Sequence, residues 1–178
     1  MTKIFWGRVC LETGTSLYYF QKGGKVQRVI HQFKYKGNTA LGFYLGEMLG
    51  RDLRSSGFYE DIDCILPVPL HPKRERMRGF NQSEVIARGI AASMSVPCHP
   101  SWLIRKKATA TQTRRARFSR WQNVAEVFET PSPELLVNKS VLLVDDVITT
   151  GSTLEACAQK LLAVEGVRVW VATLAITE

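Results

Sequence analysis

Residues 141–153 limit the possible folds of this chain more than any other segment. Four apolar residues, Val141 to Val144, are followed by two acids, two apolar residues and then Thr-Thr-Gly-Ser-Thr. A continuous apolar run of this kind indicates a strand that is buried on both faces of a parallel sheet. The apolar spacing over 154–164 indicates a helix, and residues 167–176 have the pattern of a further strand. A strand, a loop, a helix and a strand in this order predict an α/β domain.

The loop between that strand and that helix has the composition of a phosphate-binding site. The start of a helix offers N–H groups without helical partners, and a glycine lets the backbone approach a ligand closely. The residues expected to bind the phosphate of a substrate are Thr149, Thr150, Gly151, Ser152 and Thr153. A sugar 5-phosphate fits, because Asp145 and Asp146 stand at the carboxyl end of the strand, where ligands of α/β sheets bind, and can accept from ribose hydroxyls. The Gly-Lys-Ser/Thr ending of a Walker A loop and the spaced glycines of a dinucleotide fingerprint are absent.

The positive charge of the chain is concentrated in its middle third. Twelve basic and only two acidic residues lie between residues 71 and 120, so this stretch accounts for the whole net charge of +8. The basic residues form two clusters, 73–78 and 105–120. Such clusters are typical of loops that bind phosphates or nucleic acid, and equally of a solvated basic surface.

Composition excludes several classes of protein. The 178 residues are 45% hydrophobic, which is enough for a core and too much for a disordered chain. No apolar run is long enough to cross a membrane, and the first residues lack the apolar stretch of a secretory signal. The four cysteines and three histidines show no CxxC or HExxH spacing, so no metal site is expected. These features predict a cytoplasmic protein with no membrane span and leave its oligomeric state open.

The remaining segments complete an alternation of strands and helices. The expected strands outside the last third are 3–9, 16–20, 63–68 and 101–104, of which the first two would form an N-terminal hairpin. Helices are expected from residue 26 to Gly37, from residue 41 to Gly57, and from a cap at Asn81 or Ser83 to Met94. Residues 105–123 lack an apolar period and are interpreted as a long functional loop. We expect one domain, 1–178, in which the hairpin takes up 1–22 and the core 62–178, with the phosphate loop at 141–154.

These motifs resemble those of a known superfamily. Residues 141–153 are similar to the loop that binds phosphoribosyl pyrophosphate (PRPP) in type I phosphoribosyltransferases. Arg78-Gly79-Phe80-Asn81-Gln82 resembles one branch, the competence protein F (ComF) family. Further matching pieces follow in family order: Lys34 to Asn38, Pro67 to Leu70, Thr109 with Gln112, and Arg120 with Asn123. The likeness extends over residues 5–176.

The resemblance implies a type I phosphoribosyltransferase-like fold, with a mostly parallel sheet flanked by helices and an N-terminal hairpin and helices as an appendage. It implies PRPP as the ligand, with Mg²⁺ bound together with PRPP rather than by a cluster of protein ligands. Catalytic contacts are expected from Asp145, Asp146 and Arg78. Pyrophosphate contacts are expected from a loop that carries Pro69, Lys73, Arg74 and Gly79 besides Arg78. A strained or cis peptide is expected in Val68-Pro69-Leu70, and residues 105–123 fall where the family has a closing loop.

The chain departs from the family pattern at two positions and at its start. Arg115 stands where the family commonly has leucine, and Ser119 stands where an acid is common. The closing loop is therefore more basic than usual. The four-cysteine zinc module that begins many relatives is absent, and the sequence leaves open whether it is naturally absent.

Three functions are consistent with these residues. The first is transfer of phosphoribose from PRPP to an unidentified nitrogen nucleophile, by positioning and charge stabilisation and without a protein nucleophile. The second is a non-catalytic role in competence, in which the protein binds single-stranded DNA, with Trp102, Phe118 and Trp121 among the arginines, and works with DNA-uptake proteins. The third is a regulator that senses PRPP without turnover. The sequence leaves open whether the chain is an enzyme.

Overall fold

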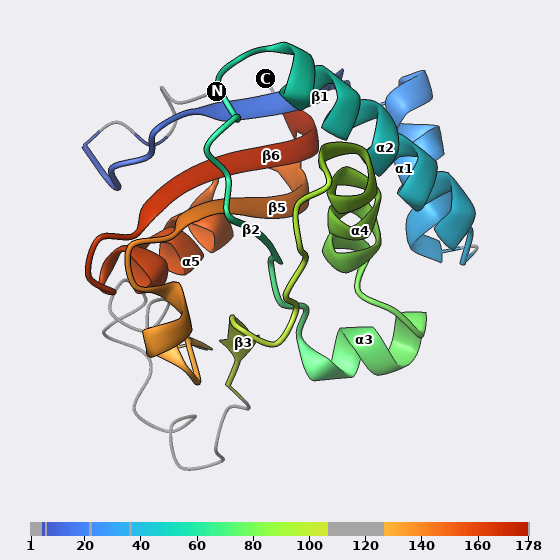
Figure 1. The fold of residues 1–178 in the computed structure, drawn as a ribbon. Helices are drawn as coiled ribbons and strands as arrows, with labels where there is room; N and C mark the ends of the chain where they lie inside the picture. The colour runs from blue at the N-terminus through green and yellow to red at the C-terminus, as the bar shows by residue number, and fades with distance from the viewer. Residues whose placement is uncertain (1–4, 6, 22, 36, 107–126, 178) are drawn as a thin grey trace.

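The computed structural model describes residues 5, 7–21, 23–35, 37–106 and 127–177. Its centre is a four-stranded sheet in the order β1-β6-β5-β2, and every neighbouring pair in it is parallel (Figure 1). The strands of this sheet are β1 (Gly14–Phe20), β2 (Cys64–Pro67), β5 (Ser140–Ile148) and β6 (Arg168–Thr177). A separate antiparallel pair consists of β3 (Ile104–Arg105) and β4 (Phe128–Glu129).

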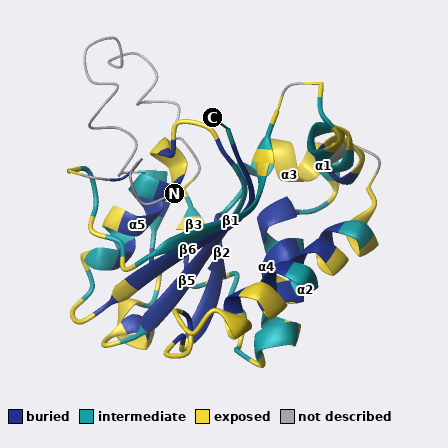
Figure 2. Cartoon of the chain, turned by 90° about the horizontal axis from the view of Figure 1, so that it is seen from above, coloured by how far each residue is buried: buried dark blue, intermediate teal, exposed yellow. Residues whose placement is uncertain are grey.

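Helices cover both faces of the sheet (Figures 1 and 2). One side carries α1 (Lys25–Tyr35), α2 (Thr39–Ser55) and α4 (Gln82–Met94), and the other carries α5 (Ser152–Leu162). Two short helices complete the described chain, α3 (Pro72–Arg78) and the 3-10 helix η3 (Pro133–Leu136). The parallel sheet between helical layers confirms the expected type I phosphoribosyltransferase-like α/β fold.

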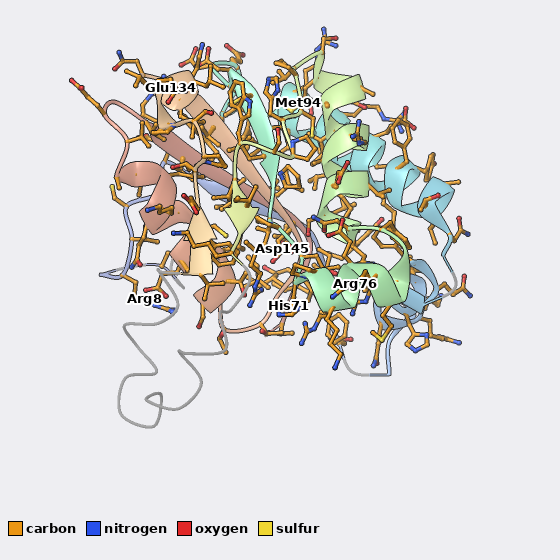
Figure 3. The ribbon with its side chains drawn as sticks, turned by 90° about the horizontal axis from the view of Figure 1, so that it is seen from below. Arg8, His71, Arg76, Met94, Glu134 and Asp145 are labelled. Atoms are coloured by element: carbon orange, nitrogen blue, oxygen red, sulfur yellow. The ribbon has the colours of Figure 1, made fainter. Side chains whose placement is uncertain are left out.

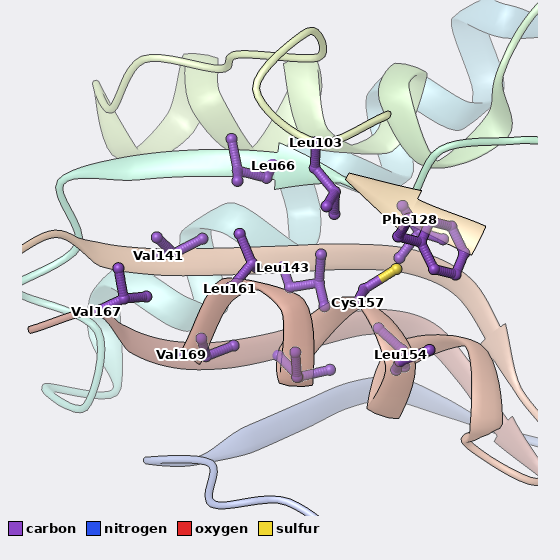
Figure 4. Close-up of a cluster of buried hydrophobic side chains, with 14 of the residues drawn as sticks. Leu66, Leu103, Phe128, Val141, Leu143, Leu154, Cys157, Leu161, Val167 and Val169 are labelled. Carbon is purple, nitrogen blue, oxygen red and sulfur yellow. The ribbon is translucent and has the colours of Figure 1, made fainter. Parts of the chain in front are cut away.

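The central strands divide the core into two layers because successive side chains of a strand point to opposite faces. Leu66, Val141 and Leu143 pack in the layer beneath α5, which Figure 4 shows around Leu154 and Cys157. The residues between them, such as Ile65, Leu142 and Val144, pack in the layer beneath α2 and α4. The apolar run at 141–144 is therefore buried on both faces, as its sequence predicts.

Glycines bring α2 and α4 close together. A Cβ atom on Gly46 would lie 2.3 Å from the carbonyl oxygen of Ile86, and one on Gly89 would lie 2.2 Å from that of Phe43. No side chain larger than hydrogen fits at either contact. The two backbones therefore pack directly on each other along the middle of α4.

The expected N-terminal hairpin is not found among the described residues, and residues 3, 4 and 6 of its expected first strand lie outside them. Residues 14–20 pair in parallel with β6, from Gly14 opposite Val171 to Phe20 opposite Thr177. Before them the chain makes a turn in which the amide of Arg8 donates to the carbonyl oxygen of Phe5 at 3.0 Å. An isolated two-stranded hairpin is marginal in water, whereas the open edge of β6 offers a full ladder to the same residues. The first strand therefore belongs to the main sheet.

Three other elements differ from expectation. The expected loop over 69–79 contains α3, because Pro72 occupies its first turn and Gly79, with φ of 80°, ends it. Strand β5 continues to Ile148, so both acids of the motif lie in the strand rather than in a turn. The strand expected at 101–104 is limited to Ile104–Arg105, and its partner β4 was not expected. Residues 107–126, most of the expected closing loop, lie outside the described residues.

Among the described residues, no helix has both the length and the apolar character that a membrane crossing requires.

Candidate functional site

The carboxyl ends of β2 and β5 lie side by side, at the point where the chain changes the direction in which it adds strands to the sheet. From β2 the chain runs through α4 to Cys98, which forms a parallel bridge to Ile65. Ile65 also pairs with Leu142 of β5, so Cys98 lies on the far edge of β2. From β5 the chain runs through α5 to β6, in the opposite direction across the sheet. Open α/β sheets bind ligands at such a switch point, outside the carboxyl ends of the strands.

A small pocket lies at this point, just beyond β5. It has a volume of about 40 Å³, which is room for roughly three water molecules and is therefore on the scale of a phosphate group. Its lining consists of Asp145, Val147, Ile148, Thr149, Thr150, Gly151, Ser152, Thr153 and Leu154. The structure thus brings all five residues of the expected phosphate loop together with Asp145.

Gly151 shapes the floor of the pocket. It has φ of 76°, a left-handed conformation that glycine adopts without strain, and it is the N-cap of α5. Because glycine has no side chain, it provides no side-chain cap for the first amides of the helix. The amide of Ser152 donates to the hydroxyl of Thr150 at 3.4 Å, and the hydroxyl oxygens of Thr150 and Ser152 lie 3.0 Å apart. Backbone and hydroxyl donors at a helix N-terminus are the groups that bind phosphate in proteins.

The carboxylate of Asp145 is held by two donors. Its Oδ1 accepts from the hydroxyl of Ser83 at 2.8 Å and from the backbone amide of Asp146 at 2.9 Å. Both acids are half-buried, and only Asp145 lines the pocket. Cys157 of α5 lies close enough to respond to this charge. Burial raises the pKa of the Cys157 thiol well above its ordinary value, and the negative charge of Asp145 raises it further.

The segment 78–83 connects the ends of β2 and β5. The side-chain amide of Asn81 donates to the carbonyl oxygen of Val68 at 3.0 Å, and its oxygen accepts from the amide of Ser83 at 3.1 Å, which caps α4. Arg78 donates to Gln82 at 2.7 Å. Asn81, Gln82 and Ser83 are all buried. Asn81 of the motif that resembles the ComF branch thus contacts the end of β2, and Ser83, the residue that follows the motif, contacts Asp145 of β5.

The expected pyrophosphate contacts lie near the pocket but do not line it. Lys73 and Arg74 are exposed on α3, and Gly79 is the C-cap of that helix. Arg78 is engaged with Gln82, and Pro69, half-buried, follows the end of β2. The expected cis peptide is not found, since no peptide bond among the described residues is cis. Figure 3 shows Asp145, His71 and Arg76 at the end of the sheet from which α3 extends.

Two basic residues of the site were not singled out from the sequence. Arg105 on β3 is half-buried, and burial lowers the pKa of its guanidinium, as does the positive charge of Arg74. Arg8 donates from Nη1 to the carbonyl oxygen of Thr150 at 3.2 Å and forms an ion pair with Glu155 in the first turn of α5. Arg8 and Thr150 are 142 residues apart, so no local pattern could have revealed this contact.

The acids of the site suit one kind of metal ion. Within the described ranges, no group of three or more histidine, cysteine or acidic side chains could hold a metal by itself. Mg²⁺ retains several waters and is usually bound through one or two carboxylates and the phosphates of a substrate. Asp145 and Asp146 fit that donor set, provided that the ligand brings the remaining oxygens.

The expected platform for single-stranded DNA is only partly described. Trp102 is half-buried, packs against the core layer beneath α5 and stacks on His99, with ring centroids 3.8 Å apart. One face of the indole ring is therefore covered by His99 and is not available for stacking with a base. Phe118, Trp121 and the arginines between 114 and 120 lie outside the described residues.

Comparison with known proteins identifies relatives over most of the chain. The family model described as "Phosphoribosyl transferase domain" matches residues 81–176. The DNA utilization protein YhgH of Salmonella typhimurium is 32% identical over 148 residues, which are 80% of this chain and 64% of that protein. Competence protein F of Haemophilus influenzae is also 32% identical, over 80% of this chain and 65% of its own length. The chain thus spans less than two thirds of either relative.

Two solved structures share the fold. The allosteric regulatory enzyme of purine biosynthesis superposes with a TM-score of 0.51 at 19% identity, over 74% of this chain and 26% of that one. The glutamine PRPP amidotransferase of B. subtilis, in complex with ADP and GMP, gives a TM-score of 0.50 at 21% identity, over 72% and 26%. At this level of identity the likeness concerns the fold alone.

Proposed function

Because the chain belongs to the competence protein F family of the phosphoribosyltransferase superfamily, we propose that it binds PRPP and transfers its phosphoribose to a nitrogen nucleophile, with release of pyrophosphate. One observation carries this proposal. The pocket around Gly151 places helix amides and hydroxyls beside the carboxylate of Asp145 at the switch point of the sheet. A phosphorylated pentose needs this pairing, because its phosphate requires donors and its vicinal hydroxyls require acceptors.

In this proposal each part of PRPP meets a different part of the site. The 5-phosphate would bind in the pocket lined by 149–153, and the ribose hydroxyls would donate to Asp145 and Asp146. The pyrophosphate would then face the positive charges of α3 and β3. Arg74 and Arg105 support this assignment, because two like charges that repel each other are stabilised when an anion binds between them.

The proposed reaction needs no protein nucleophile. The bond from C1 of the ribose to pyrophosphate breaks and its electron pair leaves with the pyrophosphate, while the nitrogen forms a new bond to C1 and loses its proton to solvent water. Half-buried cations such as Arg105 would stabilise charge that develops on the leaving group. Asp145 and Asp146 would face a Mg²⁺ ion held by the substrate oxygens, and this ion would neutralise part of the same charge. The acceptor, the Mg²⁺ requirement and the cytoplasmic location stay predictions.

The names of the relatives favour a second candidate function in DNA uptake or use. One relative is called a competence protein and another a DNA utilization protein. If this chain binds single-stranded DNA, its affinity falls steeply with salt, and changing Arg114, Arg115 and Arg117 to alanine abolishes binding. Binding that does not respond to salt would argue against this function. A regulator that senses PRPP differs from the transferase only by the absence of turnover.

The proposed ligand is tested by thermal unfolding with PRPP and Mg²⁺. We expect PRPP to raise the melting temperature of the wild type and to leave that of the Asp145→Asn/Asp146→Asn variant unchanged. The matched control is Asp52→Asn/Asp61→Asn, which removes two exposed acids outside the pocket and should retain the shift. A shift that survives the loss of Asp145 and Asp146 contradicts the assigned ribose contacts. Release of pyrophosphate with a panel of nucleobases and amines then separates a transferase from a sensor.

A further inference from the structure

Ser83 is a buried hydroxyl residue at the start of α4 whose position calls for an explanation. Its side chain donates to Oδ1 of Asp145 at 2.8 Å, across 62 residues of sequence, and the residue is only 5% exposed. Burying a hydroxyl costs free energy unless it forms a hydrogen bond, and a bond to a carboxylate is stronger than one between neutral groups. The contact is therefore maintained by the fold and is not an incidental surface contact.

Ser83 is not needed to cap its own helix. Asn81 is the N-cap of α4, and its side-chain oxygen accepts from the amide of Ser83 at 3.1 Å. A serine so near the start of a helix often serves as the cap itself. Because Asn81 fills that role here, the hydroxyl of Ser83 can be directed at another element, the end of β5.

The effect of this contact falls on the orientation of one carboxylate. Oδ1 of Asp145 accepts from both Ser83 and the amide of Asp146, at 2.8 and 2.9 Å. Two donors on the same oxygen restrict rotation of the carboxylate about its bond to the Cβ atom. The start of α4 that carries Ser83 is itself held by the bond from Asn81 to Val68, and the glycine contacts with α2 begin one turn later, at Ile86.

We propose that Ser83 is a positioning residue, which orients Asp145 so that this carboxylate accepts from the hydroxyls of a bound pentose. The inference rests on the proposed function and explains how the same site would distinguish a sugar phosphate from phosphate alone. The loop around Gly151 binds the phosphate that is common to many ligands, whereas the pair Ser83 and Asp145 recognises the sugar. Ser83 therefore contributes to the affinity for ribose 5-phosphate and not to that for inorganic phosphate.

Isothermal titration of the full chain with ribose 5-phosphate and with inorganic phosphate tests this inference. We expect Ser83→Ala to weaken ribose 5-phosphate about tenfold, the effect of one hydrogen bond to a charged group, and to leave phosphate affinity unchanged. Ser83→Thr, which retains the hydroxyl, should keep most of the preference for the sugar phosphate. The matched control is Ser93→Ala on the same helix, where the hydroxyl donates to the carbonyl oxygen of Glu47 at 3.0 Å and the pentose affinity should not change.

The outcomes separate this inference from the function on which it rests. If the wild type prefers ribose 5-phosphate to phosphate and Ser83→Ala retains that preference, the role of Ser83 is refuted and the proposed function stands. The same holds if the variant weakens both ligands equally, since that result indicates general loosening of the fold. If the wild type does not prefer the pentose phosphate, the proposed function fails, and the inference fails with it.

Discussion

Arg8 and Thr150 join the beginning of the chain to the phosphate loop. Nη1 of Arg8 donates to the carbonyl oxygen of Thr150 at 3.2 Å, while the same guanidinium forms an ion pair with Glu155 in the first turn of α5. Figure 3 labels both Arg8 and Asp145 and shows Arg8 beside α5. The segment before β1 thus supports the helix whose first amides line the candidate phosphate pocket.

Replacing Arg8 with alanine should affect the pocket more than the stability of the fold. The ion pair is partly exposed, with 32% and 19% of the two side chains accessible, so its loss should cost at most about 1 kcal/mol of unfolding free energy. We expect a several-fold loss of affinity for ribose 5-phosphate, because the carbonyl group of Thr150 loses its donor. The control is Arg88→Ala, which removes a surface ion pair with Glu84. Titration of both variants with ribose 5-phosphate checks the effect. Equal affinities in the two variants would refute a role for Arg8.

Gly151→Ala should destroy phosphate binding by two routes. A Cβ atom at φ of 76° strains the backbone by about 1 kcal/mol, and the added methyl group occupies part of a pocket of only about 40 Å³. Gly23→Ala is the matched control, since Gly23 has φ of 81° and a Cβ atom there meets nothing within 4 Å. Both variants should lose similar stability in urea, and only Gly151→Ala should lose affinity for phosphate. Loss of affinity in both would show that backbone strain, and not the pocket, is responsible.

Asn81→Asp should destabilise the protein although the cap of α4 is retained. The carboxylate keeps an acceptor for the amide of Ser83 but removes the donor to Val68, which leaves a buried carbonyl group facing a negative charge. We expect a loss of about 1–3 kcal/mol of unfolding free energy, measured in urea. The control is Asn38→Asp, at the exposed cap of α2, where the side chain only accepts, from Leu41 at 3.0 Å. A loss of unfolding free energy no larger than that of the control would mean that the contact between Asn81 and Val68 does not contribute to stability.

The buried thiol of Cys64 and the half-buried thiol of Cys98 predict how stability depends on pH. Burial is the main cause that raises the pKa of Cys64 to about 12 and that of Cys98 to about 11, from an ordinary value of 9.0. Well below pH 9 each thiol is neutral in both the folded and the unfolded chain, so ionisation of the thiols does not lower the unfolding free energy there. As the pH rises from 9 towards 11, the thiols ionise in the unfolded chain only, and each lowers the unfolding free energy by up to about 1.4 kcal/mol per pH unit.

Cys98→Ala tests this dependence through the slope of stability against pH. The variant should lose stability less steeply between pH 9 and 11 than the wild type, whatever its stability at pH 7. Cys10→Ala, which removes an exposed thiol, is the control and should keep the slope of the wild type. Identical slopes in the wild type and Cys98→Ala would contradict the raised pKa of Cys98.

Local sequence pattern predicted the parts of the site that a single segment builds. The apolar run of β5 and the cap of α4, expected at Asn81 or Ser83 and found at Asn81, each depend on neighbours within a few residues, and the structure confirms both. The loop to Gly151 is shorter than expected, because β5 continues to Ile148. The pattern failed for α3, because the density of basic residues suggested a loop although Pro72 and Gly79 bound a helix.

Contacts between distant segments could not be predicted. Nothing in residues 14–20 shows that their partner is β6 rather than a neighbouring strand. The same is true of Ser83 and Asp145, which the packing of α4 on the sheet brings together. The sequence contains the chemistry of the site, but the supports that orient it arise from tertiary packing.

The central claim is that the backbone at the start of α5 binds the phosphate of a phosphorylated pentose. A titration of the ¹⁵N-labelled chain with ribose 5-phosphate, followed through its amide resonances, tests this claim most directly. We predict saturable shifts that are largest at Gly151, Ser152 and Thr153 and that need much higher ligand concentrations in the Asp145→Asn/Asp146→Asn variant. Saturable shifts confined to other segments, or no shifts at millimolar ligand, would contradict the account.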